Sequence, residues 1–183
     1  RVSLTGKYST GLEVDVEREC YPVNADNVVG RIEGTGLKEQ AVVVVAHYDH
    51  LGRQGEELFY GAVDNASGTA AVLEIAEAFA EAARQGVRPR RSVLFLLVSG
   101  EEMGLYGSRY YTENPLVAVD RTYACVNIDM IGREGERLMD DEDYMSGGAF
   151  ISEDLLDIAQ RNWETAAPGV EFRMSYRERV TGG

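Results

Sequence analysis

Histidine and acidic residues follow three apolar segments of this sequence, at the point where each segment ends. They are His47 and Asp49 after residues 41–46, Glu101 and Glu102 after residues 92–98, and Asp129 after residues 122–128. A further carboxylate, Asp64, directly precedes a long helical pattern. One imidazole with several carboxylates is a ligand set that suits zinc and, less specifically, cobalt or manganese. Because like charges gather only where a cation compensates them, the set predicts a metal site.

Each of these residues, taken alone, has an ordinary structural explanation. His47 fits a core histidine whose hydrogen bonds are satisfied, and Asp64 fits a turn residue or helix cap. Glu101 and Glu102 fit an exposed helix start, where negative charge is favourable. These explanations do not account for the regular placement of the residues at the ends of predicted buried strands and, for Asp64, at the start of the long helix. That placement favours the metal site.

The spacing of the residues suggests how they divide the work. The second residue along an extended segment returns to the same side, so Asp49 is predicted to accept a hydrogen bond from the His47 ring and to orient it. In the adjacent pair Glu101 and Glu102, one carboxylate can face the metal while its neighbour faces an attacking water as general base. The remaining histidine, His50, is interpreted as a solvent-facing loop residue.

The elements that must position these residues follow from apolar patterning. Continuous apolar runs predict strands buried on both faces, and apolar residues at helical spacing, such as Val72, Ala76 and Phe79, predict a helix. The predicted strands are residues 12–19, 26–33, 41–46, 92–98 and 122–128, and the predicted helices are about 67–85, 105–113 and 152–165. Alternating buried strands and helices indicate an α/β three-layer sandwich, with a mixed, largely parallel central sheet flanked by helices. Ligands bind such sheets beyond the carboxyl ends of the strands.

Length and charge narrow the class of protein. The 183 residues are expected to form one domain over residues 1–183. The net charge of -13 argues against nucleic acid and anionic membrane surfaces as partners. No apolar stretch approaches the ~20 residues of a membrane span. The acidic run at residues 140–143 is interpreted as a solvated loop. Cys20 and Cys125 are expected to be free thiols, although a single disulfide stays open and the redox state is undetermined.

Four stretches of the sequence, occurring in order, are similar to those of a known family. They are residues 46–52, 61–68, 98–108 and 127–132, and the similarity covers roughly residues 26–135. On these motifs the chain resembles the co-catalytic zinc aminopeptidases of metallopeptidase family twenty-eight. The resemblance implies a zinc exopeptidase-like fold and hydrolysis of peptides that have a free N-terminus. It also implies a secreted or periplasmic location and a cis peptide bond between Asp64 and Asn65.

The resemblance also implies a role for each matched residue. His47 and Asp129 would hold one zinc, Asp64 would bridge two zincs, and Glu102 would hold the second. Glu101 would be the general base and Asp49 the partner of His47. In such sites two metals about 3.5–4 Å apart clamp a hydroxide and polarise the scissile carbonyl.

The sequence departs from the family pattern at the second zinc. That zinc normally takes a histidine well downstream of Asp129, but the chain holds two histidines and none follows His50. The chain is therefore expected to be a catalytic domain incomplete at its C-terminus, holding at most one zinc tightly. Two other interpretations stay open: a glutaminyl cyclase-like enzyme with a single zinc, and a catalytically inactive ectodomain that binds partners through the same fold. Carboxypeptidase or dipeptidase activity also stays open.

Overall fold

The computed structural model describes residues 24–131, 149–150, 153–166 and 175–176. The predicted strand at residues 12–19 and the acidic run at residues 140–143 lie outside the described residues, as does Cys20. Cys125 is a free, exposed thiol. No helix in the described parts of the chain is long and apolar enough to cross a bilayer.

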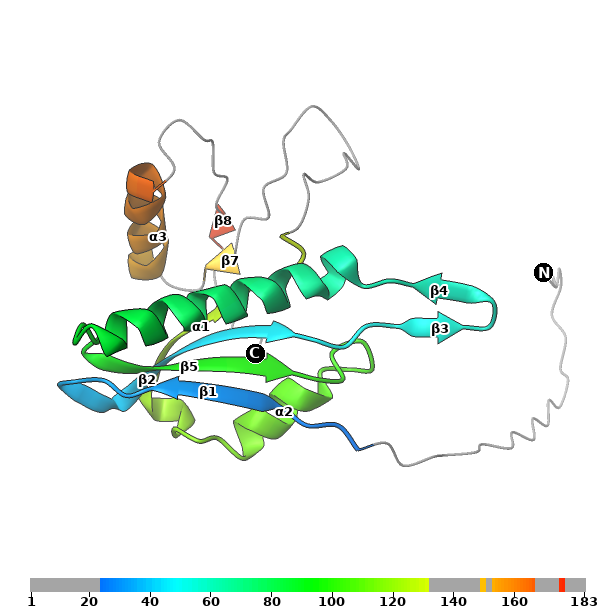
Figure 1. Ribbon diagram of the computed structural model, residues 1–183, viewed down its shortest axis with the longest axis horizontal. Helices are drawn as coiled ribbons and strands as arrows, with labels where there is room; N and C mark the ends of the chain where they lie inside the picture. The colour runs from blue at the N-terminus through cyan, green and yellow to red at the C-terminus, as the bar shows by residue number, and fades with distance from the viewer. Residues whose placement is uncertain (1–23, 132–148, 151–152, 167–174, 177–183) are drawn as a thin grey trace, which may run out of the picture.

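A four-stranded sheet forms the centre of the fold (Figure 1). Its strands, in spatial order, are β1 (Val28–Ile32), β5 (Arg91–Val98), β2 (Leu37–His47) and β6 (Thr122–Asn127). Strand β2 pairs in parallel with both β5 and β6, and β1 pairs antiparallel with β5. This confirms the predicted mixed, largely parallel sheet.

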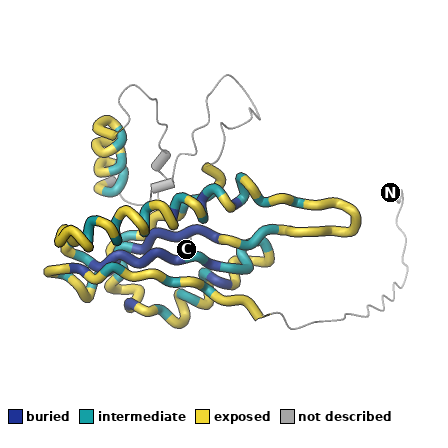
Figure 2. The backbone as a smooth tube through the Cα atoms, viewed as in Figure 1, coloured by how far each residue is buried: buried dark blue, intermediate teal, exposed yellow. Residues whose placement is uncertain are grey.

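Strand β2 is buried on both faces, which explains its continuous apolar run. Val43 and Val45 belong to one hydrophobic cluster, whereas Val44 and Ala46 belong to the cluster on the opposite face. Successive side chains of a strand point to opposite faces, so a strand covered on both sides needs apolar residues at every position. Figure 2 shows the buried backbone concentrated in the central strands.

Helices cover the two faces of the sheet and complete three layers. Helix α1 (Gly68–Arg84) packs the predicted stripe of Val72, Ala76 and Phe79 against one face, where the Phe79 and Phe95 ring centroids lie 5.7 Å apart. Helix α2 (Tyr106–Glu113) packs on the other face through Tyr111. The predicted helices at 67–85 and 105–113 are confirmed within one or two residues.

The smaller elements lie around this core. Strands β3 (Gly52–Gln54) and β4 (Glu57–Phe59) form a hairpin, followed by the kinked turn η1 (Ala62–Ser67), in which Asp64 and Asn65 have non-helical backbone angles. A 3-10 turn, η2 (Val119–Arg121), precedes β6, and the remaining elements are β7 (Ala149–Phe150), α3 (Glu153–Ala166) and β8 (Ser175–Tyr176). Helix α3 confirms the predicted helix at 152–165. The hairpin was not predicted, because its strands are three residues each and mostly exposed.

The packing of α1 on the sheet gives a stability test. Phe79→Ala should lower the free energy of unfolding by about 3 kcal/mol, the lower end for Phe→Ala in a core, because Phe79 is half-buried. Leu73→Ala, on the exposed side of the same helix, should change it by less than about 0.5 kcal/mol. Urea denaturation measures both. Equal costs for the two variants would show that the stripe does not face the core.

Candidate metal centre

The six residues predicted to form the site lie together beyond the carboxyl ends of the parallel strands. His47 is the last residue of β2, and Glu101 and Glu102 follow β5 after a two-residue turn. Asp129 follows β6, and Asp64 lies in η1, just before α1. The arrows of β2 and β5 point to the same end of the sheet in Figure 1. The parallel pairing of β2 with β5 and β6 is therefore what gathers these segments.

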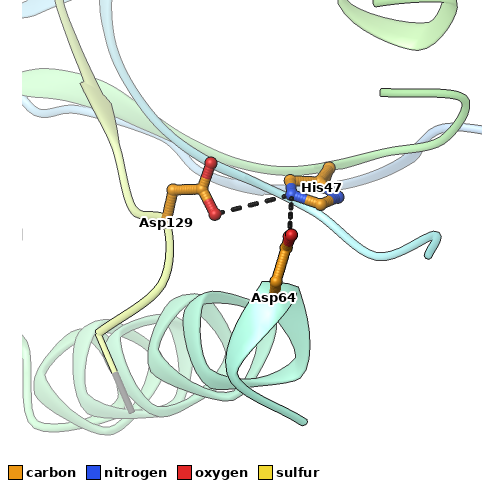
Figure 3. A group of neighbouring side chains, drawn as sticks. All are labelled: His47, Asp64 and Asp129. Carbon is orange, nitrogen blue, oxygen red and sulfur yellow. Dashed lines mark ion pairs between the residues drawn. The ribbon is translucent and has the colours of Figure 1, made fainter. Parts of the chain in front are cut away.

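His47 lies between two carboxylates (Figure 3). Its Nε2 is 3.2 Å from Asp64 Oδ1 and 3.5 Å from Asp129 Oδ1. Ligand atoms held tetrahedrally at zinc bond lengths lie about 3.3 Å apart. Both distances are therefore close to the spacing of ligands around one ion. One ligand atom from each of the three residues lies within 4.8 Å of the others, as in a second group at this edge.

The hydrogen bond on the other side of the His47 ring leaves Nε2 available to a metal. Nδ1 lies 3.1 Å from the backbone carbonyl oxygen of Asp49. A carbonyl only accepts, so Nδ1 carries the proton and the lone pair of the neutral ring is on Nε2. The predicted partner, the Asp49 carboxylate, is farther away, with Oδ1 at 3.7 Å. Asp49 thus orients His47 chiefly through its main chain.

The Asp49 carboxylate is occupied by two backbone donors. The backbone N–H of Glu101 donates to Oδ1 at 3.2 Å, and that of Glu102 donates to Oδ2 at 3.3 Å. These bonds tie the segment after β2 to the segment after β5. One side chain therefore fixes the position of both glutamates relative to His47.

Asp129 provides a direct test of whether the site suits a cation. Its Oδ1 is buried and has no hydrogen-bond partner among the described residues, although His47 Nε2 lies 3.5 Å away. A buried carboxylate oxygen without a partner is costly, and a bound cation would satisfy it. With the Nε2 lone pair of His47, this oxygen makes the residues present a good fit to zinc.

A second group of possible ligands shares Asp64 with the first. It comprises His50, Asp64 and Glu102. His50 Nδ1 lies 2.8 Å from Glu102 Oε1 and 4.0 Å from Asp64 Oδ2. The interpretation of His50 as a solvent-facing loop residue was wrong, because its side chain is only 20% exposed and is paired with Glu102. The sequence held one indication that His50 belongs to the site: the chain has only two histidines, and they lie three residues apart.

Asn65, which sequence reasoning missed, fixes Asp64 relative to Asp129. Asn65 is 1% exposed; its Nδ2 donates to the Ile128 carbonyl at 3.0 Å, and its Oδ1 accepts from the Gly68 N–H at 2.9 Å. A Cβ at Gly68 would collide with Asn65 Oδ1 and with the Ile128 carbonyl, so this close approach requires glycine. The peptide bond between Asp64 and Asn65 is cis, as the resemblance implies.

The electrostatics of the site favour a proton on His47 when no cation is present. Burial alone lowers the pKa of His47, but the negative charge of Asp129, the Asp49 carbonyl, and the carboxylates of Glu101 and Asp64 together outweigh burial and raise it. A cation in the first group would replace that proton.

The pKa of Glu101 is also raised. Loss of surrounding water is the largest cause; His47 opposes it, and repulsion from the neighbouring carboxylates of Glu102, Asp129 and Asp49 adds to it. A raised pKa makes the Glu101 carboxylate a stronger proton acceptor, which is the property that a general base needs.

These pKa shifts predict how the stability of the metal-free chain changes with pH. A raised histidine pKa contributes stability that is full below the unfolded value of 6.5 and is lost as the pH rises through the folded value. Glu101 acts in the same direction, because its ionisation costs more in the folded state than in the unfolded state. The free energy of unfolding in chelator should therefore fall with rising pH, and less steeply in His47→Gln. A steeper fall in the variant would contradict this.

Comparison with known proteins shows the family to which the chain belongs. Residues 27–172 match the family model described as Peptidase family M28. The chain is 33% identical over 123 residues to a probable zinc metalloprotease of Pyrenophora teres f. teres, a match that spans 64% of this chain and 25% of that protein. It is 35% identical over 129 residues to the aminopeptidase NAALADL1 of Rattus norvegicus, spanning 68% of this chain and 16% of that protein.

A solved structure is similar as well. An aminopeptidase from Aneurinibacillus sp. strain AM-1 matches with a TM-score of 0.48 and 25% identity, covering 58% of this chain and 24% of that chain. The chain thus spans about a quarter or less of the length of the proteins that it matches.

The α/β sandwich brings an imidazole and several carboxylates together in groups that could hold a metal ion. The chain belongs to peptidase family M28, a family of zinc metallopeptidases, which confirms the resemblance recognised in its motifs.

Proposed function

We propose that this chain carries the catalytic centre of a zinc-dependent exopeptidase, an aminopeptidase by preference, that removes N-terminal residues from peptides. The observation that carries the proposal is the ligand-like spacing of His47 Nε2, Asp64 Oδ1 and Asp129 Oδ1, beside a glutamate with a raised pKa. The family match and the relatives named as a zinc metalloprotease and an aminopeptidase support it.

The residues divide the chemistry as follows. Bound zinc supplies a Lewis acid that polarises a peptide carbonyl and makes a bound water more acidic. His47, Asp64 and Asp129 would hold one ion, and Glu102 together with Asp64 would hold a second. Glu101 accepts the proton of the attacking water and delivers it to the leaving amine.

The position of Asp64 favours a peptidase with two metal positions over a single-zinc glutaminyl cyclase. Its Oδ1 faces His47 and its Oδ2 faces His50, so the two oxygens point toward different groups. Hydrolysis of an aminoacyl anilide, compared with cyclisation of a glutaminyl peptide, separates the two activities. A protein inactive on both substrates that still binds zinc would support a binding role for the fold instead.

The role of Glu101 is testable by an isosteric change. Glu101→Gln should keep its zinc and lose at least about 10²-fold in turnover, because the amide cannot accept the proton. Glu102→Gln, one residue away, is the matched control and should weaken zinc binding. Metal content after dialysis and the rate on an aminoacyl anilide measure both. Turnover of Glu101→Gln within a few-fold of the parent would contradict the base role.

The two metal positions should differ in affinity. The first position has His47 and Asp129 as ligands of its own, besides Asp64, which both positions share. The resemblance assigns only Glu102 to the second position alone. Zinc binds tightly when protein supplies most of its ligands, so these 183 residues should hold at most one zinc tightly. Titration against a chromophoric chelator measures this. Two zincs held with equal affinity would contradict it.

A further inference from the structure

His50 has no part in the mechanism above, yet it lies within the site. Its side chain is 20% exposed, and that of its partner Glu102 is 17% exposed. The 2.8 Å distance from His50 Nδ1 to Glu102 Oε1 is short, as expected for a charge-assisted hydrogen bond. The net contribution of a hydrogen bond to stability is larger when one partner is charged, so this contact can hold the Glu102 carboxylate in one orientation.

The chemistry of this contact makes His50 a donor and not a ligand. A carboxylate accepts hydrogen bonds, so the Nδ1 of His50 that faces Glu102 must carry a proton. A protonated ring nitrogen has no lone pair for a metal. The same nitrogen lies 4.0 Å from Asp64 Oδ2, which is beyond hydrogen-bond distance. Of these two carboxylates, Glu102 is therefore the one that accepts the hydrogen bond.

The segment between β3 and η1 holds the His50 ring in place. Gly61 has φ 66°, and a Cβ there would lie 2.9 Å from His50 Cβ and 3.0 Å from His50 Cγ. The ring therefore rests directly on the Gly61 backbone, where no larger residue fits. Phe59, at the end of the hairpin, contacts the ring edge-on, with centroids 6.5 Å apart and planes at 65°.

We propose that His50 is a positioning residue for the second metal position. Packed on Gly61 and Phe59, it donates its Nδ1–H to Glu102 and holds that carboxylate facing Asp64. The inference rests on the proposed function, because it concerns the same centre. It assigns the β3–β4 hairpin to the metal centre as a support for Glu102. Removal of such a supporting hydrogen bond weakens metal binding about 10- to 100-fold.

Three variants of His50 separate positioning from direct ligation. Alanine removes the donor. Asparagine places an amide N–H near the position of Nδ1 and restores the donor, although it is a poor zinc ligand. Glutamine carries the same amide one carbon farther out and serves as the matched control. Circular dichroism checks that all three variants fold.

The experiment is a cobalt titration of the 183-residue chain, followed by visible absorption, which reports each ion as it binds. The first equivalent should bind equally in all variants, because His47, Asp64 and Asp129 are unchanged. The second, weaker equivalent should lose about 10- to 100-fold in affinity in His50→Ala and His50→Gln. In His50→Asn it should bind close to the wild-type affinity.

Other results would overturn the proposal. Unchanged second-ion binding in His50→Ala would show that Glu102 needs no support. A loss in His50→Asn as large as in His50→Ala would indicate direct ligation by the ring. A wild-type chain that takes up only one ion would leave Glu102 without a metal to face and overturn the role of His50 alone. A chain that binds no cobalt would overturn the proposed function together with it.

Discussion

Repulsion among carboxylates is the constraint around which this centre is built. Five of them converge at one edge of the sheet: Asp49, Asp64, Glu101, Glu102 and Asp129. In the absence of a cation, each needs a donor or a positive group nearby. Two backbone N–H groups donate hydrogen bonds to Asp49, the His47 ring lies between Asp64 and Asp129, and His50 is paired with Glu102. Asp129 Oδ1, which is buried without a hydrogen-bond partner among the described residues, marks where a cation is most needed.

The sheet sets the level at which these groups meet. Strand β2 pairs His47 with Val98 of β5, so the glutamate turn begins at the level of His47. On the other side Val45 pairs with Asn127, the last residue of β6. Two residues farther along the chain lie His47, at the end of β2, and Asp129, just beyond β6. Because both faces of β2 are packed, a slip of one residue would exchange the side chains of the two hydrophobic clusters, so the fit of these clusters favours the observed register. The packing of the core therefore helps to fix the distance between Asp129 and His47, which is buried at the end of β2.

The sequence predicted the parts of the fold that depend on apolar burial and missed the parts that depend on polar contacts. The run of valines in β2 and the Val72–Phe79 spacing in α1 each indicate one structure, because burial demands a periodic pattern. The β3–β4 hairpin has no such demand, as it is largely exposed. Asn65 and His50 are typical of loops by residue type. The sequence alone does not distinguish a buried polar side chain with hydrogen-bond partners from an exposed one. Most ligand candidates were found because they follow buried strands, and Asp64 because it directly precedes a long helix. The supporting residues have no such regular position in the sequence.

The distance along the chain between the ligands has a consequence for folding. His47, Asp64, Glu102 and Asp129 approach one another only after β2 has paired with both β5 and β6, so an unfolded chain offers no preassembled site. An ion that binds only the native state stabilises it by mass action. His47 and Asp129 would then hold together the ends of a long loop, whose entropic cost grows only logarithmically with length. Unlike a disulfide, such a link would act on the native state alone, with a strength set by the concentration of free zinc.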